Sequence, residues 1–168
     1  MRVRTIVMLT VTTLILFAVS GAGQTPSSPG FDQLKTLVGD WEGRGENGKT
    51  YRASYKLVSG GHALLEVLTP PEESEMMTVY HQDSNRVAMT HYCAANNQPH
   101  MRTAALTGRP KELDFVSVGV SNLASPTAGH MHALVVILDD KDQFTQKWTW
   151  RENGKDRVEV FHFTRKKS

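Results

Sequence analysis

Residues 37–45 read LVGDWEGRG, and this stretch decides between two folds. Its alternating glycines suit either a phosphate-binding loop or a first β-strand. A dinucleotide-binding loop or a P-loop needs a strand before the glycines and a long helix after them, and the P-loop also needs a Gly-Lys-Ser/Thr sequence. The sequence around residues 37–45 predicts neither element and contains no such lysine. We therefore interpret the stretch as a first strand, in which glycines allow a bend and a close backbone approach.

Alternation of apolar and polar residues continues through the rest of the chain. Tyr51, Ala53 and Tyr55 alternate with polar residues, and the pairs Asn47-Gly48 and Asn153-Gly154 are typical of tight hairpin turns. The expected strands are 41–45, 50–59, 62–69, 76–82, 86–94, 101–108, 112–120, 130–139, 143–152 and 155–166.

Short connections between these strands predict antiparallel pairing of sequence neighbours. Residues 31–37 form at most two helical turns, and no later segment has a sustained helical period, so no helices cover the sheet. Closure removes the sheet edges most simply. The sequence predicts an all-β, antiparallel up-and-down barrel of about ten strands with a short N-terminal helix, forming one domain over 31–168.

The N-terminus has the pattern of a secretory signal peptide. Arg2 and Arg4 precede a largely apolar run of 14 residues at 6–19, and small residues follow. A membrane-spanning helix needs about 20 apolar residues. We expect a signal peptide over 1–23, cleavage near residue 22 or 23, a flexible leader at 24–30, and a secreted or periplasmic protein with no membrane span in its mature form.

The composition of the chain limits the classes of partner and the covalent cross-links that we expect. The chain has 19 basic and 17 acidic residues, and removal of Arg2 and Arg4 with the signal peptide leaves 17 of each. A balanced charge gives no support for nucleic-acid binding. Cys93 is the single cysteine, so no intrachain disulfide can form.

The Gly39-x-Trp41 triplet at the head of such a chain resembles the calycins, and in particular uncharacterised secreted bacterial lipocalin-like proteins. The stretches LVGDWEGR, YKLVSGGHALLE, MTHYCAANNQPHMR and FTQKWTWRENGK carry this resemblance. It implies that Gly39 and Trp41 close one end of the barrel, with Arg157 or Arg165 against the tryptophan ring. It implies no assigned activity.

The run GDWEGRG also resembles nitrobindin, a calycin barrel that binds haem through a histidine near its C-terminus. The resemblance implies His162 as a haem ligand. His162 shares a strand face with Val158 and Val160, whereas Phe161 and Phe163 form the other face, and either face could point inward. Haem is therefore an alternative, and no cofactor is predicted.

Inward-facing rows supply the candidate ligand-binding residues. These are Tyr55, Met89, His91, Cys93, His130, His132, Trp148 and Trp150. Their mixture of aromatic, apolar and imidazole groups predicts a small apolar or amphipathic ligand. His91 and Cys93 belong to the fifth strand and His130 and His132 to the eighth. These strands lie three spacings of about 4.8 Å apart, whereas metal ligands converge to about 2.0–2.3 Å from the ion. We therefore predict no metal site, although a metal held by His130 and His132 is an alternative.

No catalytic residue is predicted. The chain lacks Gly-x-Ser-x-Gly and His-Glu-x-x-His motifs, and Cys93 points parallel to His91 rather than at it. A binding protein is favoured over an enzyme, and a small cavity enzyme with His91 or His132 as acid or base is an alternative. We interpret Glu66 as solvated, because Ala63, Leu65 and Val67 could face inward in its place; the alternative is a buried Glu66 paired with Arg102.

Overall fold

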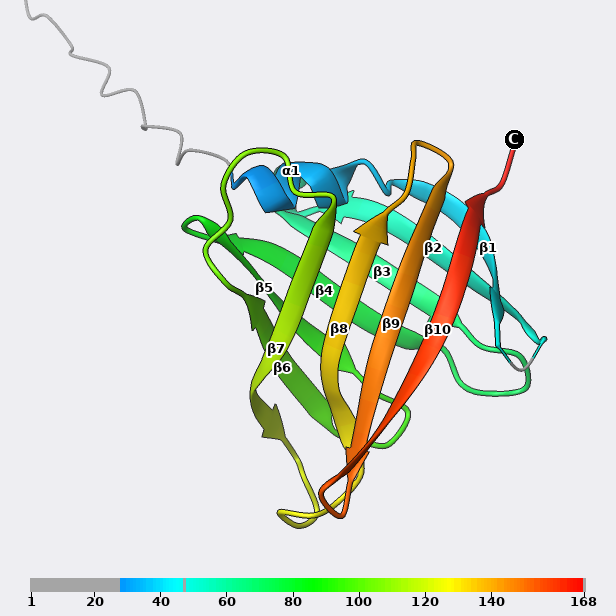
Figure 1. Cartoon of the computed structure of the whole chain (residues 1–168), viewed down its shortest axis with the longest axis vertical. Coiled ribbons are helices and arrows are strands. Elements are labelled where there is room, and N and C mark those ends of the chain that lie inside the picture. The colour runs from blue at the N-terminus through cyan, green and yellow to red at the C-terminus, as the bar shows by residue number, and fades with distance from the viewer. Residues whose placement is uncertain (1–27, 47, 168) are drawn as a thin grey trace, which may run out of the picture.

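The computed structural model describes residues 28–46 and 48–167 and forms a closed antiparallel β-barrel (Figure 1). Its ten strands follow one another around the wall, and β1 closes the barrel by pairing with β10. The predicted fold class is confirmed. The predicted signal peptide at 1–23 lies outside the described residues.

The element bounds are close to those expected from alternation. They are α1 (Pro29–Lys35), β1 (Gly39–Gly45), β2 (Thr50–Val58), a 3₁₀ turn (Ser59–Gly61), β3 (Ala63–Thr69), β4 (Met76–Asp83), β5 (Arg86–Tyr92), β6 (Gln98–Thr103), β7 (Glu112–Ser121), β8 (His130–Leu138), β9 (Gln143–Glu152) and β10 (Lys155–Arg165).

Strand β6 differs most from the prediction of 101–108. It starts earlier because Cys93 and Asn97 close a tight turn, with the Cys93 amide donating to the Asn97 carbonyl at 3.1 Å. It ends earlier because the Thr103 side chain takes over the ladder: its Oγ1 accepts from the Val87 amide at 3.0 Å and donates to the Ala104 carbonyl at 2.8 Å.

The α1 end of the barrel is closed by side chains. Phe31, Leu34 and Leu37 are buried as part of the hydrophobic core. Trp41 is buried with them, and its Nε1 donates to the Leu37 carbonyl at 2.7 Å. Gly39 begins β1 with φ of 125°, a backbone conformation that other residues rarely adopt.

The residue over the Trp41 ring is Arg165, not Arg157. The guanidinium carbon of Arg165 lies 4.1 Å from the ring centroid. The same guanidinium donates to the carbonyls of Val38 and Thr36, each at 2.8 Å. One cation therefore binds the end of the last strand to the segment that enters the first strand.

Strand β3 turns the opposite face inward from the one we expected. Leu64, Glu66 and Leu68 point into the barrel, and Glu66 is 0% exposed. The interpretation of Glu66 as solvated is therefore wrong. The neutral donors Tyr80 and Gln146 take the place of Arg102, the arginine partner considered in the alternative. Arg102 lies outside and pairs with Asp83 at 3.2 Å.

Strand β8 contains a β-bulge at His132. Met131 pairs with Trp150 and Ala133 with Thr149, so that His132 is an extra residue. A bulge shifts the alternation by one. Leu134 faces the core and Met131 faces the barrel interior, whereas His130 pairs with Arg151, out of the row of Leu134, and is itself buried. The expectation that His130 and His132 share the inward row of Leu134 is therefore wrong.

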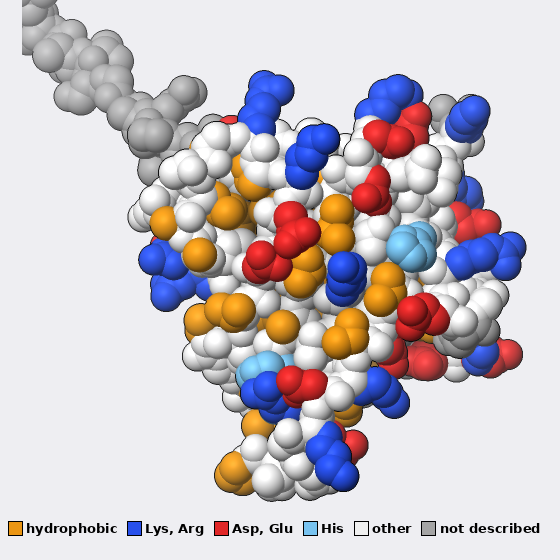
Figure 2. Space-filling model, viewed as in Figure 1, with side chains coloured by type: hydrophobic (Ala, Val, Ile, Leu, Met, Phe, Trp, Pro, Cys, Tyr) orange, Lys and Arg blue, Asp and Glu red, His pale blue; other side chains and the backbone are white. Residues whose placement is uncertain are grey.

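The outer wall mixes apolar and charged side chains (Figure 2). Val116 and Val158, more than half exposed, are among its apolar residues. Apolar and charged groups lie next to one another across the face shown, which separates the apolar side chains into small groups.

Candidate functional site

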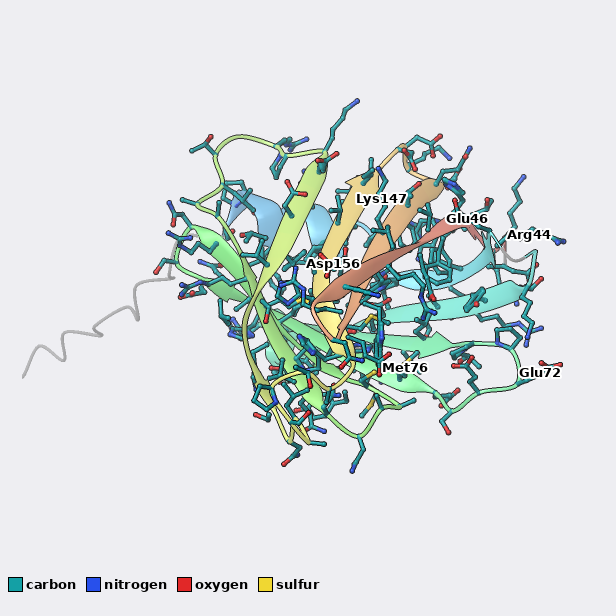
Figure 3. All side chains as sticks on the ribbon, turned by 60° about the horizontal axis from the view of Figure 1, so that its bottom comes forward. Arg44, Glu46, Glu72, Met76, Lys147 and Asp156 are labelled. Carbon is teal, nitrogen blue, oxygen red and sulfur yellow. The ribbon has the colours of Figure 1, made fainter. Side chains whose placement is uncertain are left out.

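A cavity of about 270 Å³ lies at the end of the barrel opposite α1, which we call the open end. Figure 3 brings this end forward and labels Met76 on β4, which contributes to the lining. Most of the wall is apolar or aromatic, and its large apolar and aromatic side chains are Tyr51, Leu68, Met76, Met131, Trp148, Trp150 and Phe161. These side chains come from strands on opposite sides of the barrel, so the cavity spans its interior.

The shape of one wall depends on a glycine. A Cβ at Gly129 would lie 2.1 Å from Cζ2 of Trp150, which no side chain could occupy. Gly129 is held in place by Asn97, whose Nδ2 donates to its carbonyl at 3.0 Å. The absence of a side chain at 129 therefore allows Trp150 to lie against the start of β8.

Charged groups lie at the mouth of the cavity. Arg157 and Glu159 line it and pair with each other at 3.1 Å, and Glu73 is exposed on the β3–β4 connection. Because these groups reach solvent, the ion pair contributes little to stability. The mouth carries two carboxylates and one guanidinium.

His91 is the polar group at the inner end of the cavity. It is 1% exposed, and its Nδ1 lies 2.9 Å from the Thr78 hydroxyl, its cross-strand neighbour on β4. Its Nε2 has no hydrogen-bond partner among the described residues. Burial lowers the pKa of His91 to about 4, so the ring is neutral at physiological pH. A buried, unpartnered ring nitrogen next to a cavity is a natural contact for a ligand.

A buried hydrogen-bond network lies behind His91. Glu66 accepts from the Tyr80 hydroxyl at 2.6 Å and from Gln146 Nε2 at 2.8 Å, and the same Nε2 donates to Tyr55 at 2.9 Å. Trp148 Nε1 donates to Gln146 Oε1 at 3.1 Å. Burial raises the pKa of Glu66, and the hydrogen bonds that it accepts oppose this rise. The network is fixed from both sides of the barrel.

Cys93 lines the cavity and is half-buried. Burial raises the pKa of its thiol, so the sulfur carries its proton at neutral pH. The nucleophile would be the thiolate, and this environment gives Cys93 no activation.

The structure divides the eight predicted ligand-binding residues into three groups. His91, Cys93, Trp148 and Trp150 line the cavity. Tyr55 and Met89 point inward but are buried deeper in the core. The rings of His130 and His132 lie 5.6 Å apart at the bulge, and neither residue lines the cavity.

The prediction from the sequence did not include several residues that line the cavity. Tyr51 shares an alternating row with Tyr55, and this row is the signal that could have identified it. Met131 has no such signal, because only the bulge turns it inward. Phe161 belongs to the more apolar face of β10, which is the inward one.

His162 faces solvent on the outer side of β10, with its Nδ1 3.0 Å from the Thr145 hydroxyl. It therefore does not fit an axial haem ligand inside the barrel, and that hypothesis is wrong. Within residues 28–46 and 48–167, no three His, Cys, Asp or Glu side chains come together in a way that could hold a metal ion.

Among the helices that the structure describes, none has the length and hydropathy to cross a membrane. Comparison of the sequence with protein-family models finds no matching family. Comparison with curated proteins finds no matching relative.

Proposed function

We propose that the protein is a lipocalin-like binding protein that holds one small, largely apolar molecule in the open end of its barrel. The cavity of about 270 Å³ carries this proposal, because one end of the barrel is closed by α1 and Trp41 while the other keeps a hollow with aromatic walls. Concave, mostly apolar cavities with a few polar groups are the usual sites for small ligands.

The volume limits the ligand. Drug-sized ligands occupy cavities of about 300–1,000 Å³, so this ligand is smaller, on the scale of one substituted aromatic ring or a short branched chain. The same space would hold about nine water molecules at their liquid volume. Displacing such water from walls formed by Trp148, Trp150 and Phe161 favours an apolar occupant.

Binding accounts for the site better than catalysis. A general base works best with a pKa near the working pH, whereas the pKa of His91 is about 4. Cys93 keeps its proton, so the cavity lacks an activated nucleophile among the described residues. His91 is suited to accept or donate a hydrogen bond without exchanging a proton.

The sequence also supports a cellular location for this function. The pattern over 1–23 is typical of a signal peptide, and we propose export to the periplasm or the medium. The balanced charge of the remaining chain suits a small-molecule carrier rather than a nucleic-acid partner.

Neighbouring methionines on β4 provide the test. Met76 lines the cavity, and Met77, 44% exposed, faces solvent. We expect propylbenzene, a single-ring apolar compound, to bind the wild-type protein in isothermal titration calorimetry. Met76→Trp should fill the cavity and weaken this binding at least tenfold, whereas Met77→Trp should bind like the wild type. Absence of binding to the wild-type protein, or equal binding by both variants, would contradict the proposal.

A further inference from the structure

Four inward side chains form one continuous row across β2 to β5. Tyr55 pairs with Glu66, Glu66 with Thr78, and Thr78 with His91. We call this set the polar row. Directly opposed residues on adjacent strands have Cβ atoms about 4.5–5.5 Å apart, so each member can contact the next. The row leads from the cavity at His91 to the buried carboxylate of Glu66.

We infer that the cavity selects uncharged molecules with a hydroxyl or N–H group, which donates a hydrogen bond to His91 Nε2. This inference rests on the proposed function, because it names the class of ligand that the same cavity accepts. It also gives a role to a buried ring nitrogen that has no partner in the described protein.

The polar row determines which ring nitrogen carries the proton. A neutral imidazole has one N–H and one lone pair, and a threonine hydroxyl has one proton to donate. The Thr78 hydroxyl lies 2.9 Å from His91 Nδ1, and Glu66 is the cross-strand neighbour of Thr78 on its other side. A hydroxyl proton directed at Glu66, the stronger acceptor, leaves the Thr78 oxygen to accept the proton of His91 Nδ1. The lone pair of His91 is then on Nε2, the unpartnered nitrogen of a residue that lines the cavity.

The surroundings of Nε2 disfavour a charged ligand. The Trp148 ring lies 4.8 Å from the His91 ring, and Leu68 and Phe161 line the same cavity, so an ion would lose its hydration there without a counter-ion. A carboxylate would also face a lone pair rather than a proton. Arg157 at the mouth is already paired with Glu159.

Matched ligands test this selection on the intact protein. 4-Propylphenol and 4-ethylanisole are isomers of one formula, and only the phenol can donate a hydrogen bond. Leaving Nε2 unsatisfied should cost about tenfold or more in affinity. By isothermal titration calorimetry, the wild-type protein should bind 4-propylphenol at least tenfold more tightly than 4-ethylanisole, and 4-propylbenzoate more weakly than either.

Variants of the row locate the effect. His91→Phe keeps a planar ring but removes Nε2, so the preference for 4-propylphenol over 4-ethylanisole should fall to about onefold. Thr78→Val keeps the ring of His91 but frees its tautomer, and should reduce the preference. Tyr92→Phe, at the next position and facing solvent, should keep the full preference.

The outcomes separate the two proposals. If the wild-type protein binds both isomers equally well, or if His91→Phe and Thr78→Val both keep the preference, the inference about His91 is wrong and the cavity remains a binding site. If His91→Phe does not fold, the wild-type ratio and Thr78→Val decide. If no compound binds the wild-type protein, both proposals fail.

Discussion

The ring centroids of His91 and Trp148 lie 4.8 Å apart, with the ring planes tilted by 44°. This contact joins β5 to β9 across the barrel interior and forms the inner end of the cavity. It also buries an imidazole against an indole, which favours the neutral form of His91. The stability of the fold should therefore depend on the protonation of this one side chain.

His91 should make the barrel less stable in acid. Its pKa is about 4 when folded and 6.5 as a free side chain, so the unfolded chain binds more protons between these values. Stability from the neutral ring is complete above pH 6.5 and is lost as the pH falls to 4, by about 3 kcal/mol in total. We expect urea unfolding to show that His91→Phe gains about this much relative to wild type between pH 7 and pH 4.

Glu66 acts in the opposite sense, because its folded pKa is raised, and the comparison with His91→Phe separates the two groups. Tyr92→Phe removes no imidazole and should keep the wild-type pH profile. A difference between wild type and His91→Phe that does not change with pH would show that His91 titrates alike in both states.

Glu66 should tolerate loss of its charge but not loss of its hydrogen bonds. Glu66→Gln keeps the shape and can still pair with Tyr80 and Gln146, so we expect a change within about 1 kcal/mol. Glu66→Ala leaves both partners unpaired beside a new void and should cost about 3 kcal/mol or more. Equal losses in the two variants, measured by urea unfolding, would show that the charge itself matters.

Arg165 should contribute more to the free energy of unfolding than an ordinary surface arginine does. Arg165→Met removes the cation over Trp41 and the bonds to Val38 and Thr36, and should lower the free energy of unfolding by about 2–3 kcal/mol. Arg165→Lys should recover less than half, because an ammonium lacks the planar fork. The exposed neighbour provides a control: Lys166→Met should change stability by no more than about 0.5 kcal/mol. If Arg165→Met costs no more than this control, Arg165 does not hold the closed end together.

Deletion of the bulge residue His132 should change the stability little, whereas deletion of a regularly paired residue of the same strand should lower it strongly. Deletion of His132 restores regular alternation between Met131 and Ala133 and removes a buried, unpartnered Nδ1, so stability should change by about 1 kcal/mol or less. Deletion of Val135 in the same strand moves part of the inward row to the outer face and should cost on the order of 3–5 kcal/mol or prevent folding. Thermal unfolding of both variants checks this, and a large loss on deletion of His132 would show that the bulge is needed for folding.

Alternation and turn residues were sufficient to predict the barrel, because each inward row repeats every second residue and each hairpin has its own turn signal. The same rule placed His91 beside the interior correctly, since Val87 and Met89 fix the face of β5. It failed at His132, because one extra residue shifts the alternation without changing composition.

Glu66 was misplaced for a different reason. Its partner Tyr80 lies 14 residues away on the neighbouring strand, and its partner Gln146 lies 80 residues away and meets it only when the barrel closes. A buried carboxylate looks unfavourable until those donors are in place. The end of β6 likewise depends on one contact, from Thr103 to the backbone of β5.

A crystal structure of the protein grown with 4-propylphenol tests the binding cavity directly. We expect electron density for one ring between Trp148, Trp150 and Met76, with the phenol oxygen within about 3 Å of His91 Nε2, a normal hydrogen-bond distance. Density for side chains that fill this space, or a ligand found only on the outer wall, would contradict a binding site inside the barrel.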